Sequence, residues 1–289
     1  MRKMNECLIR ITGLLLAGMM AAPAAMAADQ GEIRIGLNNW AENIAVSNMW
    51  KILLEDRGYD VELTSAGKSV IYSGVASDSI DMGLEVWMPK TDKQFYERFK
   101  EDISLNDAWY EGTGLGLVVP SYVDIDSIEQ LNANREKFEQ NGKPAIVGID
   151  PGSALVGLTE NAVEKYGLEL KLVTSSGPGM MSALERAYQR ENPIVVTLWN
   201  PHWAFSEYDL KYLDDPKNIY GKGENIHWMS RPELAEEHPE VVEWMNAWQM
   251  NDQQVGGLMA TIRKMDDPEA GARKWIGNHR DLVDSWFRG

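Results

Sequence analysis

Short runs of β-branched and aliphatic residues alternate with segments of helical periodicity along this 289-residue chain. Strands buried between helices need such runs, and core-facing helices need apolar residues three or four positions apart. The expected strands are Ile33–Leu37, Val61–Thr64, Met82–Trp87, Leu115–Val119, Ala145–Ile149, Leu170–Val173 and Ile194–Trp199. The expected helices are Ile44–Glu55, Val70–Ala76, Ser153–Tyr166 and Met180–Arg190, followed by a helical tail from Pro232 to Phe287. The alternation predicts an α/β fold.

The first 27 residues have the pattern of a secretory signal peptide. Arg2 and Lys3 make a basic start, an apolar stretch runs from Ile11 to Ala25, and a small-residue cleavage site ends at Ala27. The single cysteine, Cys7, precedes the apolar stretch, whereas a lipid-anchored protein needs its cysteine just after that stretch. The sequence therefore predicts an exported, periplasmic protein without an anchor and without disulfide bonds.

Charge and motifs exclude several classes of protein. The formal net charge of −16 argues against binding to nucleic acid or to anionic membrane surfaces. The chain contains no Gly-x-Ser-x-Gly elbow, no His-Glu-x-x-His helix and no glycine-rich phosphate loop. Its four histidines do not cluster in the sequence, and no metal-ligand spacing occurs. We therefore expect no catalytic residues, no metal and no cofactor.

A weak internal repeat in the sequence indicates two similar lobes. A helix, a strand and a Trp-x-Pro motif occur once at Trp87-Met88-Pro89 and again at Trp199-Asn200-Pro201. We place the two crossings between lobes near Val118–Ser121 and near Tyr220–Ile226. Residues 28–119 and 225–289 would then form lobe I, which the C-terminal helices complete, and residues 120–224 would form lobe II. A cleft between two lobes is the expected ligand site.

Three hydrophobic runs end in tryptophan, at Trp40, Trp87 and Trp199. Ligands of open α/β sheets bind beyond the carboxyl ends of strands, so three indoles at such ends can converge on one ligand. Their π faces suit a cation that has no hydrogen-bond donor. Taken one at a time, packing is an equally good interpretation of each. The helical spacing of other tryptophans favours packing for them: Trp50, Trp244, Trp248 and Trp275.

A second candidate feature is the turn that runs from Ile149 to Leu155. A strand stops there, a Pro-Gly turn follows, and a helix begins with Ser153 as the expected N-cap. Free amides at a helix start attract carboxylates, although an ordinary capped helix explains the same pattern. Tryptophan faces and helix amides together would select a small zwitterion with a methylated ammonium head.

Four segments carry a family resemblance: VGIDPGSAL, IVVTLWNPHWAFSEYDLKYLDDP, GLEVWMP and YEGTGLGLVVPSYV. In them the chain resembles the glycine betaine/proline betaine substrate-binding proteins of bacterial ABC importers, and the likeness extends over nearly the whole mature chain. The resemblance implies a two-lobed periplasmic or tethered receptor that closes around its ligand. We expect a monomer that delivers the ligand to an ABC permease with its ATPase. It implies an aromatic box of Trp40, Trp87 and Trp199, and a carboxylate held by the amides of Ala154 and Leu155.

One position departs from the family pattern. Some members carry a carboxylate-binding histidine five residues after the tryptophan of the Trp-x-Pro motif, and this chain has Asp92 there. An acid facing the site would repel a carboxylate, which leaves choline, carnitine or dimethylsulfoniopropionate beside glycine betaine as the expected ligand. Lys90, Thr91 or Asn200 would be alternative donors. His202 is the only histidine near a site residue and is expected to make local hydrogen bonds.

Two functions of other classes remain open at this level. An exported hydrolase that stacks sugars or peptides on tryptophan would need a carboxylate pair or a nucleophile in the cleft. A binding protein that feeds a sensor rather than a transporter would have the same sequence features.

Overall fold

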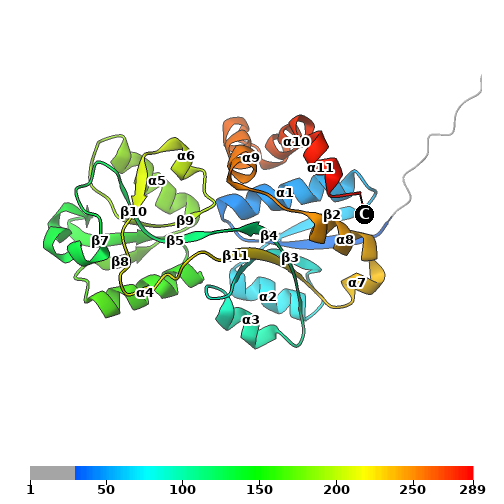
Figure 1. Ribbon diagram of the computed structural model, residues 1–289, viewed down its shortest axis with the longest axis horizontal. Coiled ribbons are helices and arrows are strands. Elements are labelled where there is room, and N and C mark those ends of the chain that lie inside the picture. Colours follow the sequence, from blue (N-terminus) through cyan, green and yellow to red (C-terminus); the bar gives the residue numbers. More distant parts are fainter. Residues whose placement is uncertain (1–29, 289) are drawn as a thin grey trace, which may run out of the picture.

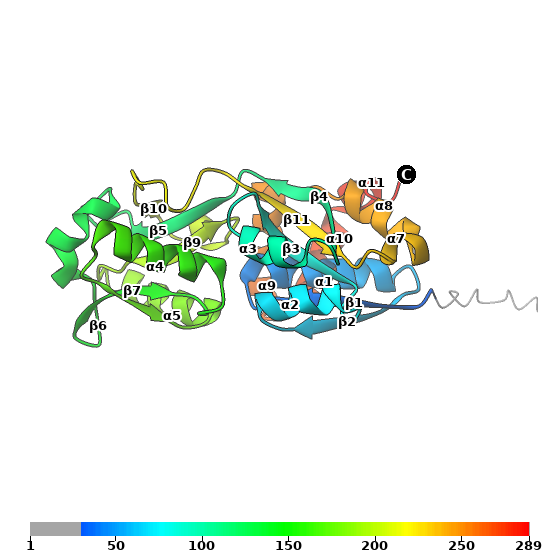
Figure 2. The same ribbon diagram turned by 90° about the horizontal axis from the view of Figure 1, so that it is seen from below.

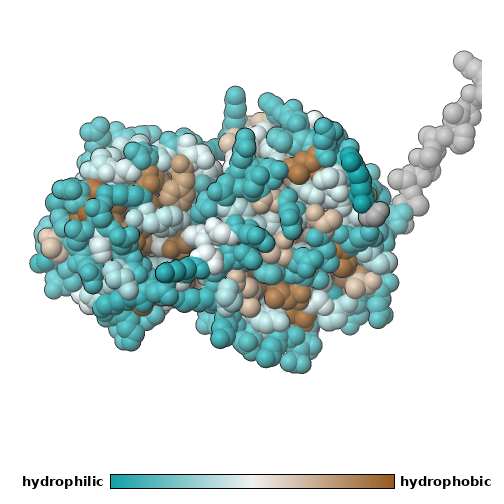
Figure 3. Space-filling model, viewed as in Figure 1, coloured by the Kyte–Doolittle hydropathy of each residue, from teal (hydrophilic) through white to brown (hydrophobic). Residues whose placement is uncertain are grey.

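The computed structural model describes residues 30–288, so the predicted signal peptide lies outside the described residues. Two lobes, each built on one β-sheet with helices on both faces, lie side by side along the long axis of the molecule (Figure 1). This is the two-lobed periplasmic-binding-protein fold that the sequence predicted. The face of the molecule seen in Figure 3 is mostly hydrophilic, with small scattered hydrophobic patches, as expected for a chain with a large net charge.

The sheet of lobe I has the strand order β2-β1-β3-β11-β4. Strand β1 is parallel to β2 and to β3, whereas β11 is antiparallel to both of its neighbours. The strands of this sheet are β1 (Glu32–Leu37), β2 (Asp60–Ser65), β3 (Met82–Met88), β4 (Ser104–Glu111) and β11 (Asn225–Ser230). The parallel strands place their carboxyl ends at one edge of the sheet, which faces lobe II.

The sheet of lobe II has the order β10-β5-β9-β7-β6, and β8 also pairs with β7. Its strands are β5 (Gly114–Pro120), β6 (Glu139–Gln140), β7 (Lys143–Gly148), β8 (Lys171–Thr174), β9 (Val196–Asn200) and β10 (Leu210–Tyr212). Strand β7 is parallel to β8 and β9, while β5 is antiparallel to β9 and β10. The carboxyl ends of β7 and β9 point back toward lobe I (Figure 1).

Helices cover both faces of each sheet (Figures 1 and 2). Those of lobe I are α1 (Ala41–Glu55), α2 (Lys68–Ala76), α3 (Lys93–Phe99), α7 (Leu234–Glu237), α8 (Pro239–Ala247), α9 (Asp252–Met265), α10 (Pro268–Asn278) and α11 (Arg280–Ser285). Those of lobe II are α4 (Ala154–Tyr166), α5 (Gly177–Tyr188), α6 (Ala204–Glu207) and the short 3-10 helices η1 (Ile128–Gln130) and η2 (Asn132–Lys137). The C-terminal helices α9 and α10 pack on α1, so the end of the chain completes lobe I.

Prolines in the helical tail begin helices. Pro239 and Pro268, which the sequence marked as interruptions, are the first residues of α8 and α10. A proline is tolerated at this position because its missing N–H would have had no acceptor within the helix.

The chain passes from lobe I to lobe II at residues 112–113 and returns through residues 213–224. The sequence placed the first crossing near Val118–Ser121, but β5 pairs with β9 and therefore belongs to the second sheet. The apolar pattern of Leu115–Val119 predicts a strand but carries no information about which sheet that strand joins. The predicted boundary at residues 224–225 coincides with the start of β11.

Tryptophans fill much of the lobe I core, as the helical spacing of several of them predicted. Trp50 and Trp248 are fully buried and meet edge to face, with ring centroids 5.6 Å apart. Trp109 stacks on Trp248 with centroids 4.5 Å apart, so it is a packing residue. Trp275 is also buried, beside His279. Within residues 30–288, every helix is too short or too polar to cross a membrane.

Candidate ligand-binding site between the lobes

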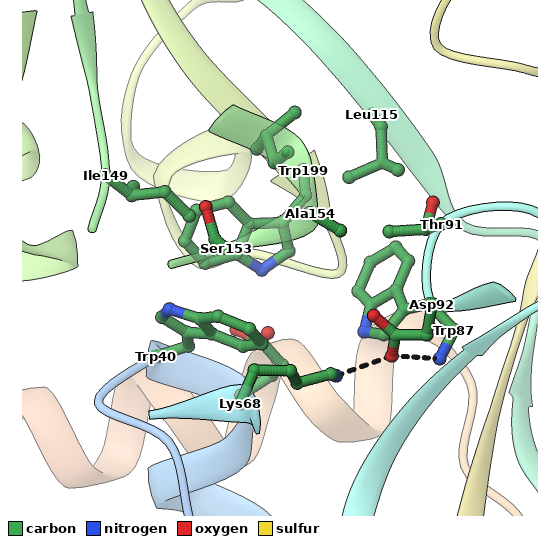
Figure 4. A pocket seen from close by; sticks show the side chains of 12 residues that line it. Trp40, Lys68, Trp87, Thr91, Asp92, Leu115, Ile149, Ser153, Ala154 and Trp199 are labelled. Carbon is green, nitrogen blue, oxygen red and sulfur yellow. Dashed lines mark hydrogen bonds and ion pairs between the residues drawn. The ribbon is translucent and has the colours of Figure 1, made fainter. Parts of the chain in front are cut away.

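A cavity lies between the facing edges of the two sheets, and together with the solvent at its mouth it holds about 330 Å³ of space free of atoms. Lobe I contributes Trp40, Glu42, Lys68, Trp87, Thr91 and Asp92 to its lining. Lobe II contributes Leu115, Ile149, Ser153, Ala154, Leu155 and Trp199. Figure 4 shows side chains from both lobes pointing into one space. The site is therefore complete only when the two lobes are together.

The three tryptophans that end the hydrophobic runs all line this cavity, and we call them the aromatic box. Trp87 is the penultimate residue of β3, Trp199 occupies the same place in β9, and Trp40 follows β1 as the N-cap residue of α1. Each is at most 8% exposed. The rings of Trp40 and Trp199 meet edge to face, with centroids 6.4 Å apart. Figure 4 shows Trp40 opposite Trp199, with Trp87 to one side.

The indole N–H groups fix the orientation of two of these rings. Trp40 donates to the Oδ1 of Asp150, 2.8 Å away, and this bond joins lobe I to lobe II. Trp87 donates to the Oε1 of Glu85 over 2.6 Å. The N–H of Trp199 has no hydrogen-bond acceptor of normal geometry among the described residues. With their N–H groups directed to carboxylates, Trp40 and Trp87 keep their π faces available to a ligand.

The start of helix α4 forms another wall of the cavity. Ser153 is its N-cap residue, and its hydroxyl accepts a hydrogen bond from the backbone N–H of Val156. Ala154 and Leu155 are the first two helical residues, and within the described chain their N–H groups have no acceptor. Free amides at the positive end of a helix form an anion site. The ordinary cap and the anion site therefore occur together, because Ser153 satisfies a different amide.

Asp92 lies in the cavity wall, but its charge is compensated there. Its Oδ2 accepts the backbone N–H of Trp87 at 2.8 Å and lies 2.6 Å from the ammonium group of Lys68. Burial raises the pKa of the Asp92 carboxyl, and the neighbouring Lys68 ammonium opposes that rise. The expected repulsion of a ligand carboxylate by Asp92 did not take Lys68 into account. No spacing in the sequence indicates that these two residues pair.

The alternative donors suggested by the sequence are engaged elsewhere. The ammonium group of Lys90 donates to two backbone carbonyls of the returning crossing. The Thr91 hydroxyl reaches the cavity wall but donates to Glu224. The side-chain amide of Asn200 donates to the Tyr110 hydroxyl over 2.8 Å, and Asn200 does not line the cavity.

His202 lies behind the aromatic box. Its ring packs edge to face against Trp199, with centroids 4.8 Å apart, and its Nδ1 accepts the backbone N–H of Ala204. Burial, with a smaller effect of Arg263, lowers the pKa of His202 to about 3, so the ring is neutral. The structure thus gives it the local hydrogen bond expected from the sequence, outside the cavity lining.

Three charged residues of the site escaped the sequence analysis. Glu42 lines the cavity, Glu85 lies beneath Trp87, and the buried Lys68 extends to within 5.1 Å of the Trp40 ring centroid. Glu42 follows Trp40 by two positions in the sequence, and Glu85 precedes Trp87 by two. Proximity in sequence was the only available signal, and carboxylates are too abundant in this chain for it to be specific. Among residues 30–288, no group of three or more histidine, cysteine or acidic side chains is placed to hold a metal ion.

Known proteins resemble this chain in both sequence and structure. The glycine betaine/carnitine transport binding protein GbuC of Listeria monocytogenes is 41% identical over 147 residues. That match covers 50% of this chain and 49% of GbuC, so it spans about half the length of this relative.

Two solved structures cover most of the chain. Lactococcal OpuAC in its closed, glycine betaine-bound conformation superimposes with a TM-score of 0.82 and 32% identity, covering 89% of this chain and 100% of OpuAC. The glycine betaine/L-proline-binding protein ProX of Borrelia burgdorferi gives a TM-score of 0.83 with 35% identity, covering 88% of this chain and 96% of ProX. Residues 31–278 match the family described as the substrate binding domain of ABC-type glycine betaine transport systems, and the chain belongs to this family.

Proposed function

We propose that this protein is the extracytoplasmic receptor of an ABC importer, which captures a quaternary ammonium compatible solute between its lobes. Glycine betaine is the ligand that the site fits best. The observation that carries the proposal is the aromatic box, assembled from both lobes beside the free amides of helix α4.

The box supplies the cation half of the recognition. A trimethylammonium group has no N–H, so it is held by charge and by contact with π faces rather than by hydrogen bonds. Each indole face contributes roughly 0.5–2 kcal/mol, with the larger values in a desolvated site such as this one. Trp40, Trp87 and Trp199 offer such faces in a cavity from which the rings themselves exclude most water.

The amides of Ala154 and Leu155 supply the anion half. A carboxylate there would accept two charge-assisted hydrogen bonds at the positive end of a 13-residue helix. The cation and anion sites lie in one cavity, so a short zwitterion can occupy both. Three π contacts and the amide pair together support micromolar affinity, about −8 kcal/mol.

Closure of the lobes follows from where these groups originate. Trp40 and Trp87 belong to lobe I, whereas Trp199 and the amide pair belong to lobe II. A ligand that contacts all of them stabilises the closed arrangement over the open one, because only the closed form provides the complete site. A permease can then distinguish the loaded receptor by its shape. We infer a monomeric receptor that passes its ligand to a permease driven by an ATPase.

Choline, carnitine and dimethylsulfoniopropionate remain the competing ligands of the same receptor. The specific observation in favour of a ligand with a strong cationic end is a pair of buried acids near the box: Glu42 lines the cavity, and Glu85 accepts the indole N–H of Trp87.

A glycosidase would need two carboxyl groups on opposite sides of the bond that it cleaves, and of the two glutamates only Glu42 lines the cavity. The chain's membership in a family of transport receptors favours binding without turnover. Incubation of the protein with each ligand, followed by recovery of the ligand unchanged by NMR, tests this directly.

Isothermal titration of the mature protein with glycine betaine, proline betaine, choline, carnitine and dimethylsulfoniopropionate tests the proposal. We expect micromolar binding of at least one quaternary ammonium ligand, and no heat with sugars or peptides. An absence of binding to every member of this panel at millimolar concentration would refute the proposed function.

A further inference from the structure

Glu42 is a fully buried carboxyl group in the cavity wall, and the proposed function so far assigns it no role. It lies in the first turn of α1, two residues after Trp40. Neither of its carboxyl oxygens makes a hydrogen bond of normal geometry within the described part of the chain. Leaving a carboxylate unpaired inside a protein costs several kcal/mol, so such a group needs either a proton or a positive partner.

The charges around Glu42 do not balance. Glu85, Asp92 and Glu42 are three buried carboxyl groups, and Lys68 is the single buried ammonium group among them. Lys68 is already engaged, since it pairs with Asp92 and donates to the backbone carbonyl of Glu85. Glu85 in turn accepts the indole N–H of Trp87. Glu42 is therefore the member of this group that lacks a positive partner.

We propose that Glu42 is the counter-charge for the quaternary ammonium group of the ligand, and that the ligand displaces a proton from the Glu42–Glu85 pair when it binds. The proposal rests on the proposed function, because the aromatic box must first bring the ammonium group into this cavity. A methylated ammonium group donates no hydrogen bond, so its interaction with the Glu42 carboxylate depends on charge alone.

The electrostatics of the free site support this exchange. Burial, and then the neighbouring Glu85 carboxyl, raise the pKa of Glu42 well above its usual range. Burial also raises the pKa of Glu85, against the effect of Lys68. We therefore expect the free protein to hold a proton on this pair. A fixed positive charge placed beside the pair favours its ionised form and lowers the pKa, so the proton is released on binding.

The sign of the pH dependence follows from this release. Binding that releases protons becomes tighter as pH rises, by at most tenfold per pH unit for one proton. The increase of affinity with pH ends at high pH, once the free Glu42–Glu85 pair has lost its proton. It is also absent at low pH, where the ligand-bound protein keeps the proton as well.

Other charged groups near α1 are occupied or neutral. His202, on the far side of Trp199, is neutral because burial holds its pKa at about 3. Asp150 accepts the N–H of Trp40. On the helices packed against α1, Arg263 pairs with Glu207. At the opposite end of α1, Arg273 of α10 lies 3.6 Å from Asp56. None of these groups supplies a positive charge to Glu42.

Proton release can be counted by titrating the protein with glycine betaine or choline in buffers of equal pH and different ionisation enthalpy. We expect the wild type to release a measurable fraction of a proton between about pH 5.5 and 7.5, where the charge of neither ligand changes. We expect Glu42→Gln, which keeps the shape of the side chain, to bind at least tenfold more weakly at pH 7.5 and to release no proton. Its affinity should vary less than twofold over that range.

Three controls make the result specific. Glu62→Gln removes a carboxylate from the exposed side of β2 and should behave as wild type. The carbon isosteres of the two ligands, in which a tert-butyl group replaces trimethylammonium, should bind without releasing a proton from the pair. Circular dichroism establishes that each variant is folded, and the proton count of the wild type tests the proposal even if Glu42→Gln does not fold.

The outcomes separate this inference from the proposed function. If the wild type binds no quaternary ammonium ligand, the proposed function itself fails. If it binds one with no proton release, or if Glu42→Gln retains both the affinity and the pH dependence of the wild type, the role of Glu42 is refuted while the receptor function stands.

Discussion

The hydrogen bond between Trp40 and Asp150 is the perturbation that tests most directly whether closure of the lobes determines affinity. The indole Nε1 of lobe I lies 2.8 Å from the Oδ1 of lobe II, and Asp150 does not line the cavity. Trp40→Phe removes the donor and keeps a ring in the box. Asp150→Ala removes the acceptor and leaves all three tryptophans in place.

The size of the effect follows from the type of bond. A hydrogen bond to a charged group contributes about 1.5–3 kcal/mol when it is well shielded from water. Asp150 is half-buried, so we reduce this to about 1–2 kcal/mol. Because the bond exists only in the closed form, its loss should weaken ligand binding by roughly 5- to 30-fold.

Each single variant has a side effect that the double variant cancels. Trp40→Phe also weakens a cation–π contact, and Asp150→Ala also removes a negative charge near the amides of α4. We therefore expect a coupling free energy of about 1–2 kcal/mol in a double-mutant cycle, measured from the glycine betaine dissociation constants of the four proteins. Additive effects, within about 0.3 kcal/mol, would show that this bond does not contribute to closure and would contradict the reasoning.

The remaining predictions concern the box and the core. Trp199→Ala removes one π face and opens the cavity, so we expect titration to show roughly 30-fold weaker ligand binding. Trp244 is half-buried on a helix away from the cavity, and Trp244→Ala should change the ligand affinity less than about threefold. Equal losses of affinity in the two variants would argue against the box. Asp81 is buried beneath Arg34 and Arg231, at 2.9 Å and 2.6 Å, and although burial opposes them, these bonds lower its pKa. Asp81→Asn should lower the free energy of unfolding by about 3 kcal/mol at pH 7. A lowered pKa of Asp81 stabilises the fold above about pH 4, and this stabilisation is lost as the pH falls further. Chemical denaturation should therefore show that the free energy of unfolding falls less on acidification in the variant than in the wild type. The same fall in both proteins would contradict the ion pairing of Asp81.

The sequence predicted the parts of the fold that local patterns encode. The β-branched runs that end at Trp87 and Trp199 are strands of the two sheets, with bounds shifted by one or two residues. Strands β4, β6, β10 and β11 were not predicted. In β11, Asn225 and His227 alternate with the buried Ile226 and Trp228, which is the pattern of a half-buried strand, whereas the predicted strands were the continuous apolar runs. The position of β11 between β3 and β4 was visible only in the tertiary pairing.

The candidate site shows the same division. Trp40, Trp87 and Trp199 were predicted from the ends of hydrophobic runs, and the helix start after Ile149 from its turn, because such local features determine where a side chain or an amide points. The family resemblance then singled out Ala154 and Leu155. All five line one cavity in the structure.

The partners of these residues were invisible in the sequence. Asp92 was read as a negative charge facing the ligand, but it is paired with Lys68, 24 positions away. Asn200 and Lys90 were candidate donors, and both direct their donors to groups outside the cavity. Hydrogen bonds and ion pairs between distant segments depend on distances of a few ångströms, which a one-dimensional pattern does not specify.

The sequence by itself determined the class of fold, the two-lobed organisation and which three tryptophans line the cavity, since strand runs and helix starts act through local geometry. Only the tertiary structure decided which sheet β5 joins, how the cavity closes through Trp40 and Asp150, and that Glu42 is buried without a positively charged partner among residues 30–288. The physical reason is that burial and charge balance are properties of the assembled site. A carboxyl group becomes an unpaired charge only when folding removes water from it and places its neighbours.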